Sequence, residues 1–453
     1  MWNKGKTPKR VVAPGFLGLA AIVAFAWLAL ASPARADVVS RWNEIAVQTL
    51  TTQTPAISPF AQARFAAIVQ LAVFEAVNAI SREYDGYLGS PVAPAAIPIL
   101  APVGASRKAA VIVAAHAVLV TYFPGSAAML NAERDASLAA ISDGSAKTDG
   151  MTTGAAAAAA MIAERAGDGS SPVSFYRPPS PTSPGEWDIT PGCPIDASGN
   201  PLGGILFNWQ NIRPFGIVTP QSGHWSEAFR PGPPPALTSN RYAKDYDELT
   251  RVGGVASAER SEDRATIARF YAALSPTFVF HAVARQLAKG QHQSLTTKAR
   301  ILALVSMATT DSLVASMTTK YHYLLWRPVT AIRAGDTDDN RKTDADATFT
   351  PFVTTPCFPS YPSNHASGSN AAIEILRRFY GSAGHAITLS ATIPLLGPVT
   401  REYTSLQEIS EDIDDARVYG GIHFRFDQDA GVRLGRTVAR FVVKHNLQRA
   451  GSN

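Results

Sequence analysis

Three short groups of residues in the C-terminal third have the side-chain types and spacing of a site that binds an oxyanion. The first group is Lys320, followed seven residues later by Arg327 and Pro328. Seven residues make nearly two helical turns, so a helix ending at Arg327 would present both cations on one face, about 10 Å apart. Two cations on an otherwise apolar helix need either an anion or contact with solvent.

The second group is the turn 361–365, with the sequence Tyr-Pro-Ser-Asn-His, which precedes small and apolar residues up to 380. Pro362 favours extended backbone before it and Ser363 is a preferred N-cap, so the turn is predicted to begin a helix. The free N–H groups at a helix N-terminus attract oxyanions, and His365 could transfer protons there. An ordinary capped loop is the alternative.

The third group contains Arg417, His423 and Asp427, with Gly420 and Gly421 between them. His423 and Asp427 are four residues apart, so on a helix the carboxylate would hold one imidazole nitrogen protonated and leave the other free. The two glycines allow close approach of backbone or ligand. Six residues of ideal helix would not place Arg417 on the face of His423, so the glycines are expected to bend the element.

Helices are expected to position these groups, because apolar residues recur at helical spacing through most of the chain and alternating strand patterns are scarce. The predicted helices are 41–50, 61–80, 106–122, 154–166, 242–251, 259–274, 281–290, 296–326 and 366–380. Between them, residues of about 170–235 are rich in Pro, Gly, Ser and Trp and are predicted to form a long irregular segment. The predicted fold is an all-α, multi-helix bundle with this segment packed on it, either covering the site or serving packing alone.

The first 36 residues are expected to be a secretory signal peptide. Four basic residues within 4–10 precede an apolar run at 11–31, and Ala34-Arg35-Ala36 has the small residues that a signal peptidase recognises. An uncleaved membrane anchor is the less favoured alternative, because about 20 apolar residues also span a bilayer. Residues 37–453 are then expected to form one exported domain, periplasmic or secreted, with no stable membrane span.

Removal of this leader also removes the charge imbalance. Lys+Arg falls from 41 to 36 and equals the 36 Asp+Glu, so the formal charge of +5 does not indicate a nucleic-acid partner. Export would place Cys193 and Cys357 in an oxidising compartment, where a disulfide and two buried thiols are both open.

Taken in order, Lys-x6-Arg-Pro, Pro-Ser-x-His and Arg-x5-His-x3-Asp resemble the three-part signature of the vanadium-dependent haloperoxidases and the type 2 phosphatidic acid phosphatase superfamily. The motifs lie within 320–427, and the long helical part before them is similar to the haloperoxidase branch. The run 358–363 resembles the chloroperoxidase stretch whose Phe, here Phe358, lines the halide pocket. Asn364 stands where the family usually has Gly, and Ala416 where many members have Ser.

The resemblance implies that an oxyanion is bound by Lys320, Arg327, Arg417, Ser363 and the backbone N–H of Asn364. A vanadate or phosphate carries two or three negative charges, which three cations would balance. The Asn364 side chain would narrow or polarise the pocket while its N–H is retained.

The resemblance also implies catalytic roles. His423 would ligate vanadate or attack phosphorus, and Asp427 would orient its ring. His365 would act as the acid or base on the opposite side, and Lys320 would polarise the peroxide.

Three functions remain open. The favoured one is an exported vanadium-dependent haloperoxidase that oxidises halide with hydrogen peroxide and uses vanadate as cofactor. The alternative is an acid phosphatase that needs no cofactor and hydrolyses phosphomonoesters through a phosphohistidine. The third is a helical protein that binds phosphate or vanadate without turnover. No oligomeric state is predicted.

Overall fold

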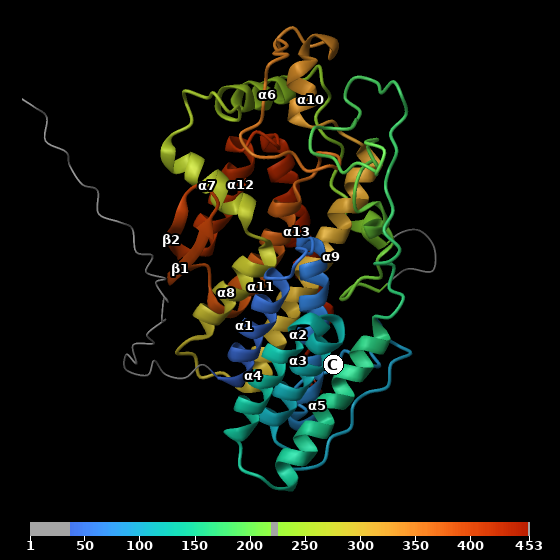
Figure 1. Cartoon of the computed structure of the whole chain (residues 1–453), viewed down its shortest axis with the longest axis vertical. Coiled ribbons are helices and arrows are strands. Elements are labelled where there is room, and N and C mark those ends of the chain that lie inside the picture. The colour runs from blue at the N-terminus through green and yellow to red at the C-terminus, as the bar shows by residue number, and fades with distance from the viewer. Residues whose placement is uncertain (1–36, 219–224, 452–453) are drawn as a thin grey trace, which may run out of the picture. The chain divides into compact units, whose positions relative to one another are not determined.

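The computed structural model describes residues 37–218 and 225–451, and the predicted signal peptide lies outside them (Figure 1). Most helices begin where a serine side chain accepts a hydrogen bond from a free N–H of the first turn. Serine caps precede α2 (Pro59–Ser81), α3 (Arg107–Tyr122), α6 (Asn240–Val252), α7 (Glu262–Ala273), α8 (Pro276–Ala288), α9 (Leu295–Tyr323), α11 (Asn364–Tyr380) and α12 (Leu406–Tyr419). The other helices are α1 (Val38–Thr51), α4 (Ala127–Ala139), α5 (Ser145–Glu164), α10 (Pro328–Arg333) and α13 (Arg425–His445).

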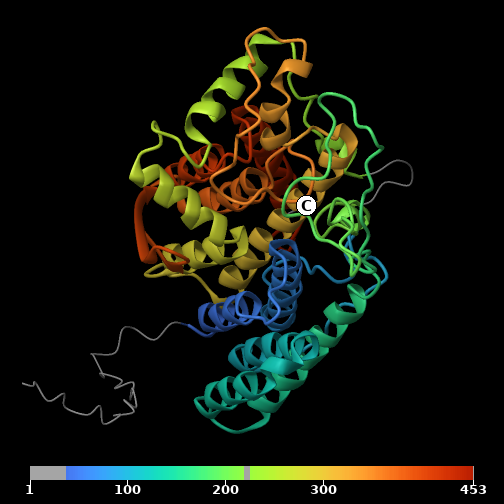
Figure 2. The ribbon, with the colours of Figure 1, turned by 45° about the horizontal axis from the view of Figure 1, so that its top comes forward.

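The predicted helical class is confirmed. The longest helix, α9, packs against α2, α11 and α13, and every residue from 299 to 321 is buried. Helices α1 to α5 gather at one end of the described chain, and α11, α12 and α13 lie towards the other (Figures 1 and 2). The central helix therefore joins an N-terminal helical group to the C-terminal group that carries the motifs.

Helices α11 and α13 pack closely because two glycines of α13 face the backbone of α11. A Cβ at Gly431 would lie 2.6 Å from the carbonyl oxygen of Ser363, and one at Gly435 would overlap the carbonyl oxygen of Ser367. The absence of side chains at these positions brings the N-terminus of α11 against the first turns of α13. The second and third motifs are thereby held together.

One two-stranded antiparallel sheet was not predicted. It pairs β1 (Ala383–Ile393) with β2 (Gly397–Ser405), in a register that places Leu389 opposite Arg401. Ile387, Leu389 and Ile393 are buried and their neighbours are more exposed, which is the alternation of a half-buried strand. The turn between the strands lies near the candidate site.

The predicted irregular segment has no α-helix among its described residues. It contains the short 3-10 helices η2 (Phe207–Asn211) and η3 (Trp225–Phe229), and it lies on the side away from the β1–β2 sheet in both views (Figures 1 and 2). Trp187, Trp209 and Trp225 are buried, so the aromatic residues attach the segment to the helices. Its Ile205 and Leu206 also line the cavity described below.

Two helices, α2 and α9, are long and apolar enough to cross a membrane, and the bent pair α7 and α8 would be a third candidate. Residues 37–453, for which no stable membrane span is expected, thus contain helices with the length and composition of one. In the structure 83% of the apolar window of α2 and 100% of that of α9 are buried by other parts of the chain. Their apolar character is explained by packing within a helical core.

Candidate active site

Lys320 lies in the last turn of α9 and is fully buried. Its Nζ donates hydrogen bonds to the carbonyl oxygens of Pro359 (2.8 Å) and Ser360 (2.6 Å). It also lies 5.2 Å from the ring centroid of Phe358, within range of a cation–π interaction. The ammonium group is thus held against the segment 358–360, which leads into the second motif.

Arg327 is also fully buried and precedes the short helix α10. Its Nε donates to the carbonyl oxygen of Phe358 (2.7 Å), and its Nη1 donates to the carbonyl oxygen of Ile422 (2.9 Å). The same Nη1 lies 3.2 Å from Nε2 of His423. Its Nη2 has no hydrogen-bond partner among the described residues. One guanidinium therefore links the first motif to the third and keeps a buried donor unpaired.

The expectation that Lys320 and Arg327 share one helix face is wrong. Helix α9 ends at Tyr323, because Leu324 adopts a left-handed conformation (φ 50°) and its carbonyl accepts the N–H of Trp187. Pro328 begins α10 and does not end α9. The two cations still converge, because both bind carbonyls of 358–360.

His423, Asp427 and Ser360 form a buried hydrogen-bonded unit. Oδ2 of Asp427 lies 2.9 Å from Nδ1 of His423, and it accepts the Ser360 hydroxyl (2.6 Å) and the Phe424 N–H (3.2 Å). Arginine can only donate, so Nε2 of His423 accepts from Arg327 and Nδ1 carries the ring proton. The unit fixes the tautomer, so Nε2 carries the ring's lone pair, and it would act as a ligand or nucleophile by exchanging its contact with Arg327 for the bound group.

His423 precedes α13 and is not within it, so its proximity to Asp427 does not come from one helix face as expected. Asp427 stands in the first turn of α13, where its carboxylate also binds the N–H of Phe424 before the helix. Helix α12 ends at Tyr419, and Gly421 follows with φ +76°. A Cβ at Gly421 would overlap the carbonyl oxygen of Gly253. The glycines thus permit close approach of backbone.

Arg417 lies in the last turn of α12 and is buried. Its Nη1 donates a long hydrogen bond of 3.4 Å to the carbonyl oxygen of Tyr271, and its Nε has no partner among the described residues. Arg417 and His423 both line one cavity. The break after α12 therefore brings Arg417 and His423 to the same space, although they belong to different elements.

The 361–365 turn begins α11 as predicted. The Ser363 hydroxyl accepts the N–H of Ala366 (3.3 Å), and its own proton remains available to donate. Asn364 is the first helical residue, so its backbone N–H has no partner within the helix. Its side chain accepts a hydrogen bond of 2.6 Å from the Ser316 hydroxyl on α9. His365 is half-buried and lines the cavity.

A cavity of about 600 Å³ joins these groups. Asn364, His365, Arg417 and His423 are among its lining residues, together with Phe358. Lys320, Arg327 and Asp427 lie behind this lining. Arg327 and Asp427 contact His423 through hydrogen bonds, and Lys320 lies beside the ring of Phe358. We call these seven polar residues together with Ser360 and Ser363 the oxyanion site.

The buried cations of the oxyanion site have lowered pKa values. Burial lowers the pKa of Lys320 well below its usual value, and the charges of Arg327 and Arg417 lower it further. Burial likewise lowers the pKa of Arg327 to about 9 and that of Arg417 to about 10. An isolated cluster of buried cations is unfavourable, and a bound anion would relieve it.

The pKa values of the two histidines are also lowered. Burial lowers the pKa of His423 well below its usual value, followed by the charges of Arg327 and Lys320. Burial and then the charge of Arg417 do the same for the pKa of His365. Burial raises the pKa of Asp427 to about 6, although the hydrogen bond from Ser360 opposes this rise. Near neutral pH both imidazoles are therefore neutral and the carboxylate is ionised.

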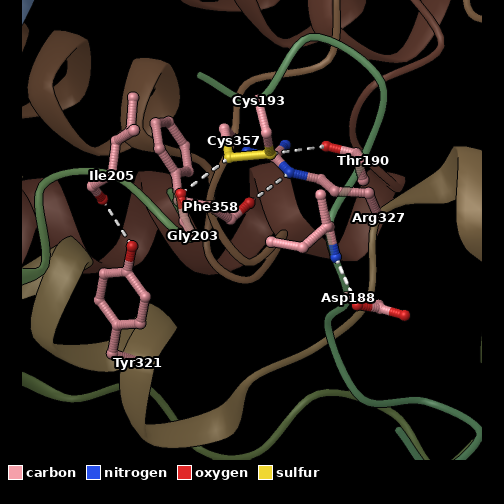
Figure 3. The surroundings of a disulfide bond; sticks show 10 residues. Asp188, Thr190, Cys193, Gly203, Ile205, Tyr321, Arg327, Cys357 and Phe358 are labelled. Carbon is pink, nitrogen blue, oxygen red and sulfur yellow. Dashed lines mark hydrogen bonds between the residues drawn. A yellow bond between two sulfur atoms is a disulfide. The ribbon is translucent and has the colours of Figure 1, made fainter. Parts of the chain in front are cut away.

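A disulfide joins the irregular segment to the residue just before the segment 358–360, whose carbonyls bind Lys320 and Arg327. Cys193 of the irregular segment is bonded to Cys357, so the disulfide alternative holds (Figure 3). Cys357 immediately precedes Phe358, whose carbonyl accepts Nε of Arg327 (Figure 3). The ring of Phe358 lies 4.9 Å from the Arg327 guanidinium carbon. The covalent link thus ends one residue before Phe358, which contacts Arg327 of the oxyanion site.

Sequence reasoning missed Ser360. It precedes the recognised Pro-Ser-x-His motif, and no local spacing marks it. Its hydroxyl binds Asp427 and its carbonyl binds Lys320. A serine two residues before the motif proline is the only local signal, and its role follows from tertiary contacts.

Comparisons with known proteins find similar sequences and folds. Residues 300–451 match the family model described as the VCPO second helical-bundle domain. A curated relative, the vanadium chloroperoxidase of Curvularia inaequalis, is 27% identical over 306 residues, which are 52% of this chain and 49% of the relative. The match thus spans about half the length of that relative.

Two solved structures share the fold. A bacterial vanadium-dependent iodoperoxidase superposes with a TM-score of 0.71 at 22% identity, covering 92% of this chain and 98% of that one. The holo form of a bacterial vanadium-dependent chloroperoxidase gives a TM-score of 0.63 at 18% identity, covering 89% and 96%. The two structures show that the chain has the fold of the vanadium-dependent haloperoxidases, and the match of residues 300–451 to the VCPO second helical-bundle domain supports the superfamily that the three motifs indicate.

Proposed function

We propose that the protein is a vanadium-dependent haloperoxidase that oxidises halide with hydrogen peroxide, and that it is exported. The observation that carries the proposal is the set of unpaired buried donors in the oxyanion site. Nη2 of Arg327 and Nε of Arg417 have no partner among the described residues, and Nε2 of His423 presents a lone pair. The leader features within residues 1–36 support export.

The oxyanion site fits a tetrahedral oxyanion such as vanadate. Nε2 of His423 would ligate the metal, and Lys320, Arg327 and Arg417 would neutralise the oxygens. Ser363 and the backbone N–H of Asn364 would add hydrogen bonds. When bound, vanadate supplies the Lewis-acid activation that makes hydrogen peroxide reactive towards halide.

The protein's own residues would then hold charge and move protons. Asp427, held by Ser360, keeps the proton on Nδ1 of His423. Neutral His365 lines the cavity and can take a proton from hydrogen peroxide as it binds. Lys320 supplies a buried positive charge against the developing negative charge on oxygen. Phe358 would form one side of the halide pocket, since its ring lies beside both Lys320 and Arg327.

An acid phosphatase is the second candidate, and it is favoured as well by the tautomer of His423, whose lone pair is on Nε2. Nε2 would attack phosphorus to form a phosphohistidine. The bound phosphate would raise the pKa of His365, so that this residue takes up a proton and gives it to the leaving alcohol. Water would then release phosphate. Phosphate and vanadate have the same tetrahedral shape and similar charge, so one donor set serves both.

The deciding experiment compares two activities in the same preparation. Bromination of phenol red by bromide and hydrogen peroxide is measured with and without vanadate, beside hydrolysis of 4-nitrophenyl phosphate. Halogenation that depends on vanadate, with little hydrolysis, is expected. Hydrolysis that vanadate inhibits would replace the proposal with the phosphatase, and vanadate binding with neither activity would indicate a binding protein.

The matched variants are His423→Ala and His322→Ala. His423→Ala should lower either activity by at least about 100-fold, because it removes the ligand or nucleophile. His322 is exposed at the end of α9 and its ring packs on Tyr323, so His322→Ala should leave both activities unchanged. Wild-type turnover in His423→Ala would show that the assigned role is wrong.

A further inference from the structure

The cavity extends beyond the oxyanion site along one face of α7. Arg269, Ala272 and Ala273 line it at positions i, i+3 and i+4, which lie on the same side of a helix. Ile393 and Leu395, at the turn between β1 and β2, also line the cavity. This part of the wall is apolar except for Arg269. The whole cavity has a volume of about 600 Å³, which is in the range that holds a small organic molecule.

The described lining of the cavity contains arginine and histidine side chains and no carboxylate. These cation-forming residues are Arg269, Arg417, His365 and His423. Three of the four belong to the oxyanion site. Arg269 does not, and the halide, peroxide and oxyanion chemistry gives it no task.

Arg269 is close to a second cation and has no counter-ion. The Arg269 and Arg260 guanidinium carbons lie 4.5 Å and 3.7 Å from the ring centroid of Phe352, another cavity residue. Arg260 is occupied, since its Nη1 donates to the carbonyl oxygens of Val252 and Gly254. After burial, the charge of Arg269 is what lowers the pKa of Arg260.

Another arginine on the same helix does have carboxylate partners. Arg264, one turn earlier on α7, forms ion pairs with Asp412 (3.3 Å) and Asp415 (3.0 Å). Within 37–218 and 225–451, no carboxylate lies at ion-pair distance from Arg269. A half-buried guanidinium beside an apolar cavity, without a protein carboxylate, matches an anionic group of the occupant.

We propose that the cavity binds an organic halogen acceptor with an apolar body and a carboxylate, and that Arg269 pairs with this carboxylate. The body would pack on Phe352 and the apolar wall, and its far end would face the oxyanion site. The inference rests on the proposed function for the reaction of this acceptor, and it adds the substrate class. Arg269 is thereby a specificity-determining residue.

Binding tests this inference without turnover. The full mature chain is first saturated with inorganic phosphate, so that a carboxylate does not compete for the oxyanion site. It is then titrated by calorimetry with 3-(4-hydroxyphenyl)propanoate and, separately, with its methyl ester. The acid should bind about tenfold more tightly than the ester, which corresponds to about 1.4 kcal/mol. Equal binding of acid and ester, or no binding of either, overturns the inference.

Three variants locate the effect. Arg269→Met keeps the apolar stem and should bring the ratio of acid to ester affinity to about one, whereas Arg269→Lys should keep part of it. Arg264→Met removes a cation from the same helix outside the cavity and should keep the full ratio. A ratio that survives in Arg269→Met, or that falls equally in Arg264→Met, contradicts a direct pairing with Arg269.

A kinetic measurement separates this inference from the proposed function. With vanadate present, Arg269→Met should raise the KM for the acid about tenfold and leave the KM for the ester unchanged. An equal loss for acid and ester would show that Arg269 acts through packing and not through the carboxylate, and this overturns the inference. If no halogenation occurs but the binding ratio behaves as expected, the proposed function fails and the carboxylate site stands.

Discussion

The Ser360 hydroxyl donates a hydrogen bond of 2.6 Å to Oδ2 of Asp427, the carboxylate oxygen that also lies 2.9 Å from Nδ1 of His423. The carbonyl of the same serine accepts Nζ of Lys320 at 2.6 Å. One residue outside the recognised motifs therefore connects the lysine of the first motif to the histidine of the third. Ser360 acts as a positioning residue, because its contacts reach the cavity through His423 and Lys320.

Ser360→Ala should lower activity and oxyanion affinity by about 10–100-fold, since it removes a partner that orients a ligating histidine through its carboxylate. Ser360→Thr keeps a hydroxyl and should restore most of both. Steady-state kinetics with anion titration measures the effect. Ser369→Ala is the matched control, because Ser369 is buried on α11 and its hydroxyl has no partner among the described residues. Equal losses in the two alanine variants would point to packing alone.

The sequence predicted the helical class and showed which residues form the three motifs, because those signals are local. Serine caps and apolar periodicity mark where helices begin and which faces are buried. The second motif was correct even in its helix start at Ser363. The alternation of apolar residues from 387 to 393 was also legible as a strand, and sequence reasoning passed over it.

The features that the sequence did not predict depend on contacts between distant segments. Leucine rarely adopts the left-handed conformation of Leu324, so seven-residue spacing favoured a helix through Arg327. The end of α9 is set by the irregular segment, where the N–H of Trp187 binds the Leu324 carbonyl. Ser360 was missed for the same reason, since its partners Lys320 and Asp427 are remote in sequence.

Binding of a tetrahedral anion should be accompanied by proton uptake near neutral pH. Burial and neighbouring cations lower the pKa values of Lys320, His365 and His423 in the anion-free protein. A bound anion raises all three pKa values, so each group binds protons more readily than before. Sulfate is a suitable probe because it remains fully ionised at neutral pH.

Calorimetric titrations of sulfate in two buffers with different ionisation enthalpies give the number of protons exchanged. Uptake should decrease in Lys320→Met and stay unchanged in Lys244→Met, a variant of an exposed lysine on α6. Proton release, or the same uptake in Lys320→Met as in the wild type, would contradict the assigned electrostatics.

The disulfide should stabilise both the fold and the oxyanion site. It joins residues 164 apart, and it ends beside Phe358, which contacts Arg327. Replacing both cysteines by serine should lower the free energy of unfolding by about 2–5 kcal/mol. Urea unfolding and oxyanion affinity are measured with and without reductant. Reductant should weaken both in the wild type and change neither in the double variant. An unchanged affinity in the reduced wild type would show that the segment 358–360 is held by its other contacts.

Asn364→Gly restores the residue that the family usually has, and it should affect stability more than activity. The Asn364 amide binds the Ser316 hydroxyl and the Met317 sulfur on α9, so its polar atoms are engaged away from the oxyanion site. Glycine keeps the backbone N–H that is proposed to bind the anion, and activity should stay within a few-fold. The free energy of unfolding should fall by about 1–3 kcal/mol, because Ser316 loses its acceptor and glycine is flexible at a helix start.

A double-mutant cycle isolates that hydrogen bond. In a Ser316→Ala background, Asn364→Gly should cost about 0.5–1.5 kcal/mol less than in the wild type, because the pair is already broken. Urea unfolding and steady-state kinetics are measured on all four proteins. A large loss of activity with unchanged stability would instead place the Asn364 side chain in the chemistry. Asn364 lines the cavity, but its side-chain amide is bound to α9. With that result, the carbon atoms of the side chain would be the part that shapes the space beside His365.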